Sequence, residues 1–235
     1  MLYPSIVALV ALVFTVALVG QYRARRKAHQ LLWAIALALG FLGAAGYLAA
    51  LRGSAAGFRL YYLAGALWMA PVMGLGSVYL HYGPDRSRWV AALVVLTGVV
   101  ASVGVMGAPL DGEALARLDG GPGQDVLDLA GLPLAALILS NTFGVVAVAA
   151  LAIRSALRSR YTPDGKGFAV GNLLLALGVI LLGMAGSLAR LGVPGTFWIM
   201  MALGFLILYG GFATINRAAA RAREAQPGGQ AGARV

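Results

Sequence analysis

Residues 2–27 read LYPSIVALVALVFTVALVG followed by QYRARRK, an apolar run that ends directly in a basic cluster. A helix rises about 1.5 Å per residue, so this run is long enough to cross the roughly 30 Å of hydrocarbon in a bilayer. Six more apolar runs follow, at about 30–51, 59–81, 89–108, 132–153, 168–191 and 196–216. They predict seven membrane-spanning segments.

Each run is predicted to be helical, because lipid offers no partner for backbone N–H and C=O groups. Strands of a membrane barrel alternate apolar and polar residues, whereas these runs are apolar on all sides. We therefore expect an all-α integral membrane protein. Residues 1–217 form the seven-helix bundle in this prediction, and residues 218–235 form a basic tail that is helical through 218–223 and partly disordered beyond.

Composition supports a membrane protein. Hydrophobic residues make up 60% of the 235 residues and charged residues 11%, against about 25% charged in soluble domains. Seven helices with short loops use the whole length, so no soluble domain is expected. The predicted location is the inner or plasma membrane, crossed several times.

Charge predicts the orientation. The first run lacks the basic residues that precede the apolar core of a signal peptide, and its basic cluster follows it. With the N-terminus outside, 14 of the 18 Lys and Arg residues fall on the cytoplasmic side, as the positive-inside rule requires. This split explains the net charge of +10 without a nucleic-acid partner. The basic loops are expected to contact anionic lipid headgroups.

The longest outer loop, at about 109–131, is acidic and rich in glycine. Calcium binding is one reading of its acids, but their spacing fits no EF-hand, so we expect a solvated loop and no metal. The acids are Asp111, Glu113, Asp119, Asp125 and Asp128.

Two segments share the pattern GxAGxLAxL, namely Gly43–Leu51 and Gly183–Leu191. The match predicts two parallel three-helix repeats, joined by the fourth helix. Small residues let helices approach closely in lipid. We therefore expect Gly40, Gly43 and Gly46, and likewise Gly183 and Gly186, to lie in helix contacts.

In topology, this three-one-three arrangement resembles the SWEET/PQ-loop sugar transporters and the microbial rhodopsins. Their motifs are missing: no helix contains a Pro-Gln pair, and 196–216 contains no lysine for a retinal Schiff base. Covalent retinal is therefore excluded. The segment Tyr61-Tyr62…Gly65-Ala66 resembles uncharacterised bacterial membrane proteins of this size, a likeness that implies no activity.

All eight carboxylates fall in loops or the tail. A proton- or sodium-coupled carrier usually places an ionisable group at membrane depth, so carboxylate-based ion coupling is not expected. No HExxH, GxSxG or Walker pattern occurs, and the chain has no cysteine. The sequence thus favours a non-enzyme, although it leaves that question open. We predict no catalytic residue, cofactor or metal.

The candidate ligand-binding residues are neutral, polar or aromatic groups within the helices. Ser140, Asn141 and Thr142 lie near mid-membrane, where Asn141 either forms an interhelical hydrogen bond or contacts a ligand. Trp68 lies deeper than an interfacial aromatic residue, and Pro71 beside it can kink the helix and open a cavity.

The remaining candidates lie at the outer ends of helices. Tyr62 belongs with Tyr61 in an interfacial belt, as does Trp198. Arg59 and Arg190 either snorkel to the headgroups or face the mouth of the bundle and attract an anionic headgroup of a ligand.

Three functions follow from these observations. The first is a bundle that binds or translocates a small neutral or lipophilic ligand. The second is a sensory or scaffolding module that acts through a protein partner. The third is an enzyme acting on lipid. It is the least supported, because no set of residues fills the geometric roles that such chemistry needs. Whether the chain acts alone, as a homo-oligomer or with another protein stays open.

Overall fold

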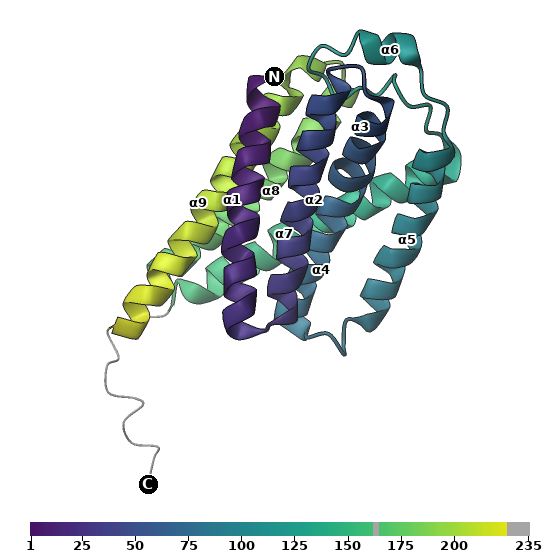
Figure 1. The fold of residues 1–235 in the computed structure, drawn as a ribbon. Coiled ribbons are helices and arrows are strands. Elements are labelled where there is room, and N and C mark those ends of the chain that lie inside the picture. The colour runs from purple at the N-terminus through teal and green to yellow at the C-terminus, as the bar shows by residue number, and fades with distance from the viewer. Residues whose placement is uncertain (162–164, 225–235) are drawn as a thin grey trace.

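The computed structural model describes residues 1–161 and 165–224, apart from the side chain of Arg190. Within these residues the chain is helical, and seven helical segments are long and apolar enough to cross a membrane. This confirms the all-helical fold and a multi-pass membrane protein. Six spans lie in α1 (Leu2–Arg25), α2 (Ala28–Ala50), α5 (Arg88–Gly107), α7 (Gly131–Ser159), α8 (Gly165–Arg190) and α9 (Phe197–Glu224) (Figure 1).

The third span is composite: α3 (Ala55–Leu60) runs into η1 (Tyr61–Trp68), a π-helical segment, and then into α4 (Met69–Tyr82). Single π-helical turns inside α-helices are often associated with function. The Met69 N–H donates to the Ala64 carbonyl, which is the i→i+5 spacing of a π-helix. The irregularity expected near Pro71 is therefore a widened helical segment that ends just before the proline.

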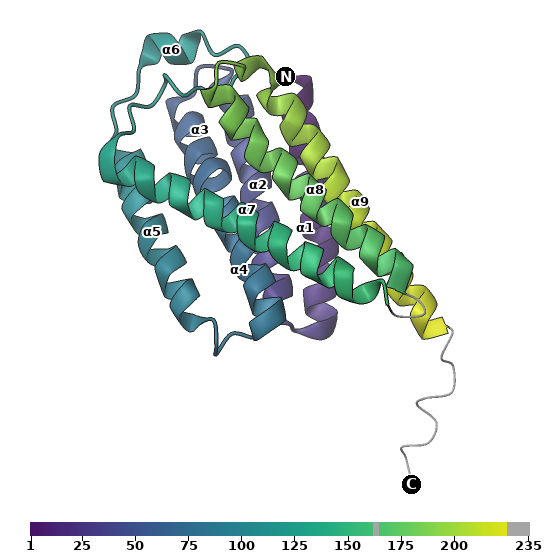
Figure 2. The ribbon, with the colours of Figure 1, turned by 180° about the vertical axis from the view of Figure 1, so that it is seen from behind.

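Six of the seven spans form a closed ring. The packing order is α1, α2, the composite third span, α7, α8 and α9, and α9 packs back against α1. Gln21 on α1 donates to Asn216 on α9 at 2.9 Å and helps to close the ring. The fourth span, α5, lies outside the ring against η1 and α7, as Figures 1 and 2 both show.

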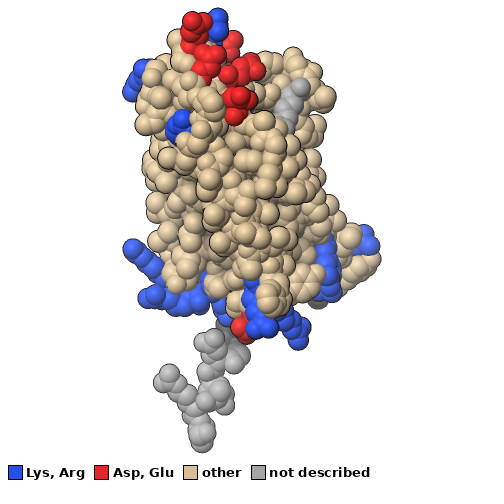
Figure 3. All heavy atoms as spheres, turned by 90° about the vertical axis from the view of Figure 1, so that its right-hand side faces the viewer, with Lys and Arg blue, Asp and Glu red and all other residues tan. Residues whose placement is uncertain are grey.

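Charge separates the two ends of the bundle (Figure 3). We call the end that carries Met1 and residues 108–130 the acidic end, since the described acidic side chains other than Asp85 and Glu224 gather there. The opposite end, which carries the 26–27 and 83–87 turns and the end of α9, is the basic end. The helix α9 continues to Glu224, so 218–223 is helical, whereas the tail beyond lies outside the described residues.

Glycines bring several helices into backbone contact. A Cβ at Gly43 would lie 2.5 Å from the Gly65 Cα, and a Cβ at Gly46 would lie 2.7 Å from the Gly57 carbonyl oxygen. Close packing at these α2 positions agrees with the sequence prediction. In the matching segment of α8 the glycines differ: Gly183 faces the Val145 side chain, and no atom lies within 4 Å of a Cβ at Gly186. The shared pattern therefore packs α2 tightly but leaves space beside α8.

The acidic segment 108–130 is a folded cover rather than the expected solvated loop. Its apolar side chains Leu115, Val126 and Leu127 are buried in the core. A short helix, α6 (Gly112–Ala116), begins at Asp111, whose carboxylate accepts from the N–H groups of Glu113 and Ala114. These two hydrogen bonds lower the pKa of Asp111 below its usual value.

Candidate functional site

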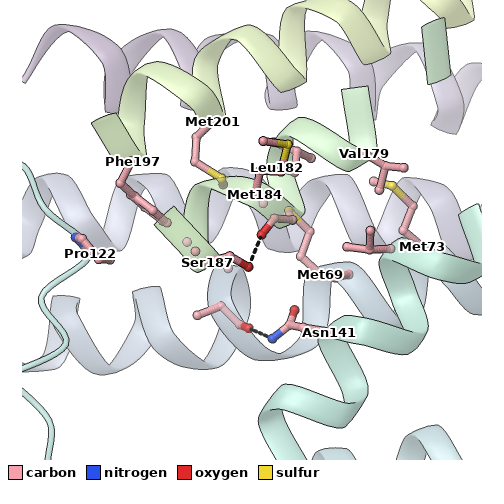
Figure 4. A pocket seen from close by; sticks show the side chains of 18 of the residues that line it. Met69, Met73, Pro122, Asn141, Val179, Leu182, Met184, Ser187, Phe197 and Met201 are labelled. Atoms are coloured by element: carbon pink, nitrogen blue, oxygen red, sulfur yellow. Dashed lines mark hydrogen bonds between the residues drawn. The ribbon is translucent and has the colours of Figure 1, made fainter. Parts of the chain in front are cut away.

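A cavity of about 500 Å³ lies inside the ring, between the acidic end and the middle of the bundle. Every span except α5 contributes to its wall, and Pro122 and Gln124 of the acidic segment cover it. Figure 4 shows side chains of α4, α8 and α9 surrounding this space, with Asn141 approaching from α7. Cavities of roughly 300–1,000 Å³ hold small-molecule ligands in proteins.

Methionine is concentrated in this wall. Four of the seven methionines in the chain line the cavity, on three different helices: Met69, Met73, Met184 and Met201. Their unbranched, polarisable side chains adapt to irregular shapes. None of the lining residues in the described part of the chain is charged. The wall therefore suits an uncharged molecule, because burying an unpaired charge carries a large desolvation cost.

Asn141 supplies the main polar group deep in the wall. Its Nδ2 donates to the Ala66 carbonyl at 2.7 Å and to the Leu137 carbonyl at 3.1 Å. Both partners are acceptors, so they fix the amide with nitrogen toward the backbone. The side-chain oxygen is left with no hydrogen bond among the described residues, and Asn141 lines the cavity. The amide nitrogen of Asn141 therefore forms an interhelical hydrogen bond, and its amide oxygen is available to contact a ligand.

Pro71 lies five residues after Ala66. In a π-helix the N–H of residue i+5 donates to the carbonyl of residue i, so residue 71 would be the donor for Ala66 if the spacing seen at Ala64 and Met69 continued. Proline has no N–H, and Asn141 provides a donor from α7 instead. The polar residue and the helix irregularity are therefore parts of one arrangement.

Thr142 and Tyr62 also line the cavity. The Thr142 hydroxyl donates to the Ile138 carbonyl of its own helix at 2.8 Å, so it adds only weak polarity to the wall. The Tyr62 ring packs on Phe58 and Tyr61, with centroids 5.2 and 5.5 Å away.

Trp68 and Ser140 are not among the lining residues, because both contact α5. The Trp68 indole lies over Gly98 and donates from Nε1 to the Ser102 hydroxyl at 3.0 Å. Ser140 donates to the Thr97 hydroxyl at 2.9 Å. These two residues attach the peripheral helix to the ring, and they are not brought together with Asn141 in the cavity.

Arg59 also holds α5. Its guanidinium donates to the carbonyls of Val105, Met106 and Ala108, where α5 ends and its last carbonyls lack helical donors. It therefore neither snorkels nor faces the mouth of the bundle. The Arg190 side chain lies outside the described residues.

Aromatic residues expected in an interfacial belt are instead buried. Trp198 and Tyr61 line the cavity with 3% and 4% of their surface exposed. The Trp198 ring packs on Tyr47, with centroids 4.5 Å apart. The Trp198 indole N–H has no hydrogen-bond partner among the described residues, and the Tyr47 hydroxyl donates to the Gly121 carbonyl. Burial in a ring of helices is a tertiary property, and no local signal distinguishes these residues from true belt residues.

A second, smaller cavity of about 80 Å³ lies nearer the basic end. Met73 lines both cavities, so it stands between them. His81 lines this second cavity, and its ring contacts the Ser155 hydroxyl on α7. The Ser77 carbonyl can only accept, so His81 donates to it from Nδ1, and in the neutral imidazole Nε2 then accepts from the Ser155 hydroxyl.

Among the described residues, no group of three His, Cys, Asp or Glu side chains lies close enough to hold a metal ion. No protein-family model, curated protein or solved structure matches this chain. The site's own chemistry is therefore the basis for a functional assignment.

Proposed function

We propose that this protein binds a small neutral, lipophilic molecule in the methionine-lined cavity and holds or translocates it without carboxylate-based ion coupling. The observation that carries the proposal is an uncharged cavity of about 500 Å³ inside a ring of membrane helices. Its volume lies within the range of ligand sites. Its adaptable methionines and the Asn141 amide oxygen, which has no hydrogen bond among the described residues, favour an apolar body with a hydrogen-bond donor.

The proposed orientation places the acidic end outside and the basic end in the cytoplasm. The separation of charge in Figure 3 supports it, because Lys and Arg are enriched in cytoplasmic loops. Since the chain has no cysteine, single-cysteine variants test it directly. A membrane-impermeant maleimide is expected to label Gly112→Cys in intact cells and to leave Arg86→Cys unlabelled until the cells are opened. The reverse pattern would invert the orientation.

Ligand binding is tested with 12-bromododecan-1-ol, a neutral alcohol whose bromine quenches tryptophan fluorescence. Replacing Trp33, Trp68 and Trp89 by Phe leaves Trp198 in the cavity wall as the only tryptophan. Titration of this protein in detergent micelles is expected to give saturable quenching.

The matched control compares two glycines at which a Cβ meets no atom within 4 Å. Gly186→Phe places a ring where the cavity is open and is expected to abolish saturation, whereas Gly20→Phe on α1 is expected to preserve it. Quenching that never saturates, or that is the same in both variants, would refute the proposal.

A sensory role is the second candidate, and α9 favours it. This single helix carries Phe197, Met201 and Phe205 of the cavity wall and continues to Arg221 and Arg223 at the basic end. A ligand that shifts the wall would therefore move the basic end of α9. Spin labels at Arg86→Cys and Arg221→Cys test this, since their separation is expected to change when bromododecanol binds. An unchanged separation in a protein that does bind would exclude the sensory reading.

A further inference from the structure

Apart from Gln124 in the acidic segment, the exposed residues of the cavity wall among the described residues lie on one side. Most wall residues on α1, α2, the third span and α9 are buried or half-buried. The exposed ones among the described residues are Gln124 and two short rows, Ile138, Thr142 and Val146 on α7 and Ile180, Met184 and Ser187 on α8. Because these rows both line the cavity and face outward, the cavity opens between α7 and α8.

The position of the opening follows from one contact. Gly183 on α8 packs against Val145 on α7, with 3.0 Å between a Cβ there and the valine side chain, and this contact closes the gap toward the basic end. Beyond it, α7 crosses the bundle obliquely and separates from α8 (Figure 2). Gly186 meets no atom within 4 Å on this side. We call the gap edged by Ile138, Thr142, Met184 and Ser187 the portal.

Described residues cover the two ends of the cavity. At the acidic end, Pro122 is buried over the cavity and the Tyr47 hydroxyl holds the neighbouring Gly121 carbonyl. Gly123, at φ +68°, packs on the Phe58 ring. Toward the basic end Met73 separates the two cavities.

We infer that the ligand enters sideways from the membrane through the portal, and that it is an uncharged, single-chain amphiphile with a hydrogen-bond donor. This inference rests on the proposed function. The portal lies in the half of the bundle nearer the acidic end, where hydrocarbon surrounds a membrane helix, so the molecules that reach it are dissolved in lipid. An uncharged gap in that position does not admit an ion, because ions are poorly soluble in hydrocarbon.

The polar groups along this path differ in how far their hydrogen-bonding capacity is already used. At the edge, the hydroxyls of Thr142 and Ser187 already donate to carbonyls of their own helices, at 2.8 and 3.2 Å, so they hold a passing donor weakly. Asn141, the next residue on α7, lies inside the portal and keeps its oxygen free of hydrogen bonds among the described residues. A hydroxyl or N–H group that passes the edge finds its acceptor there, while the apolar chain lies among the methionines.

The test measures the rate of uptake. Vesicles of phosphatidylcholine containing the protein with Trp198 alone are mixed with vesicles loaded with 12-bromododecan-1-ol, and quenching is followed over time. Thr142→Phe with Ser187→Phe narrows the portal at two exposed positions. This pair is expected to slow quenching about tenfold, equivalent to a barrier raised by about 1.4 kcal/mol.

Matched controls use the same two helices. Leu139→Phe with Leu177→Phe changes exposed residues that do not line the cavity, and the uptake rate is expected to stay unchanged. Thr142→Ala with Ser187→Ala widens the portal and is expected to speed uptake. Equal rates in the narrowed and widened proteins, or slower uptake in Gln124→Phe than in the narrowed pair, would overturn lateral uptake. Absence of saturable quenching in every protein, by contrast, would refute the binding function itself.

Discussion

The hydrogen bond between Asn141 and Ala66 gives the sharpest test of how α7 and the third span depend on each other. Asn141→Leu removes the donor and keeps a side chain of similar size. The Ala66 carbonyl then loses its donor from α7, and Pro71 offers no N–H in its place. A buried group left unsatisfied costs about 1–3 kcal/mol, whereas interhelical hydrogen bonds in membrane proteins average about 0.6 kcal/mol. We expect a loss above that average, about 1.5 kcal/mol.

The dependence on Pro71 separates this explanation from a generic polar contact. Pro71→Ala restores an N–H at the position that the π-helical spacing pairs with Ala66. In that background Asn141→Leu is expected to cost only about 0.5 kcal/mol, a coupling of about 1 kcal/mol between the two sites.

The assay is reversible unfolding by SDS in mixed micelles, followed by far-ultraviolet circular dichroism, for the four proteins of the double-mutant cycle. Thr142→Val serves as the control, because its hydroxyl bonds only to its own helix, and it is expected to change stability by less than about 0.5 kcal/mol. If the two substitutions are additive within about 0.3 kcal/mol, the explanation through Pro71 is wrong.

Three further outcomes are expected. Gly43→Ala puts a Cβ 2.5 Å from the Gly65 Cα, a backbone atom that cannot rotate away, so the free energy of unfolding in SDS should fall by about 1–3 kcal/mol. Gly20→Ala, where a Cβ meets no atom within 4 Å, should leave that free energy unchanged or raise it. Equal stabilities of the two variants would contradict the close contact. Arg59→Lys keeps the charge but loses the planar fork that reaches three carbonyls, so hydrogen exchange should accelerate in residues 105–110, and unchanged exchange would show that the fork is not needed. Hydrogen bonds from the Ala114 and Glu113 amides lower the folded-state pKa of Asp111, so its stabilisation of α6 is present above the unfolded pKa and is lost as the pH falls through the folded pKa. In acid, hydrogen exchange of the Glu113 and Ala114 amides should therefore accelerate. Asp111→Asn, which still accepts a hydrogen bond but does not titrate, should remove that pH dependence.

The aromatic and polar candidates show where prediction from local pattern fails. Trp68, Ser140 and Arg59 have the residue types of a binding site, yet they attach α5 to the ring. Trp198 and Tyr61, expected in a belt, form part of the cavity wall. Asn141 and Thr142 do line the cavity, since mid-helix polar residues in lipid must face other protein or a cavity.

By itself the sequence determined that this chain is a helical membrane protein with seven spans. The length and apolarity of a span are local properties, and each segment partitions into the bilayer according to its own residues. The order of helices in the ring, the π-helical segment paired with Asn141, and the portal between α7 and α8 were decided only in the tertiary structure. They depend on which faces meet, and in an alanine-, glycine- and leucine-rich chain almost every face is apolar, so periodicity gives no preference. The matching positions of the shared pattern contrast: Gly46 is closed by the Gly57 carbonyl oxygen, whereas Gly186 is open to the cavity. The same local pattern thus acquires opposite roles from its neighbours.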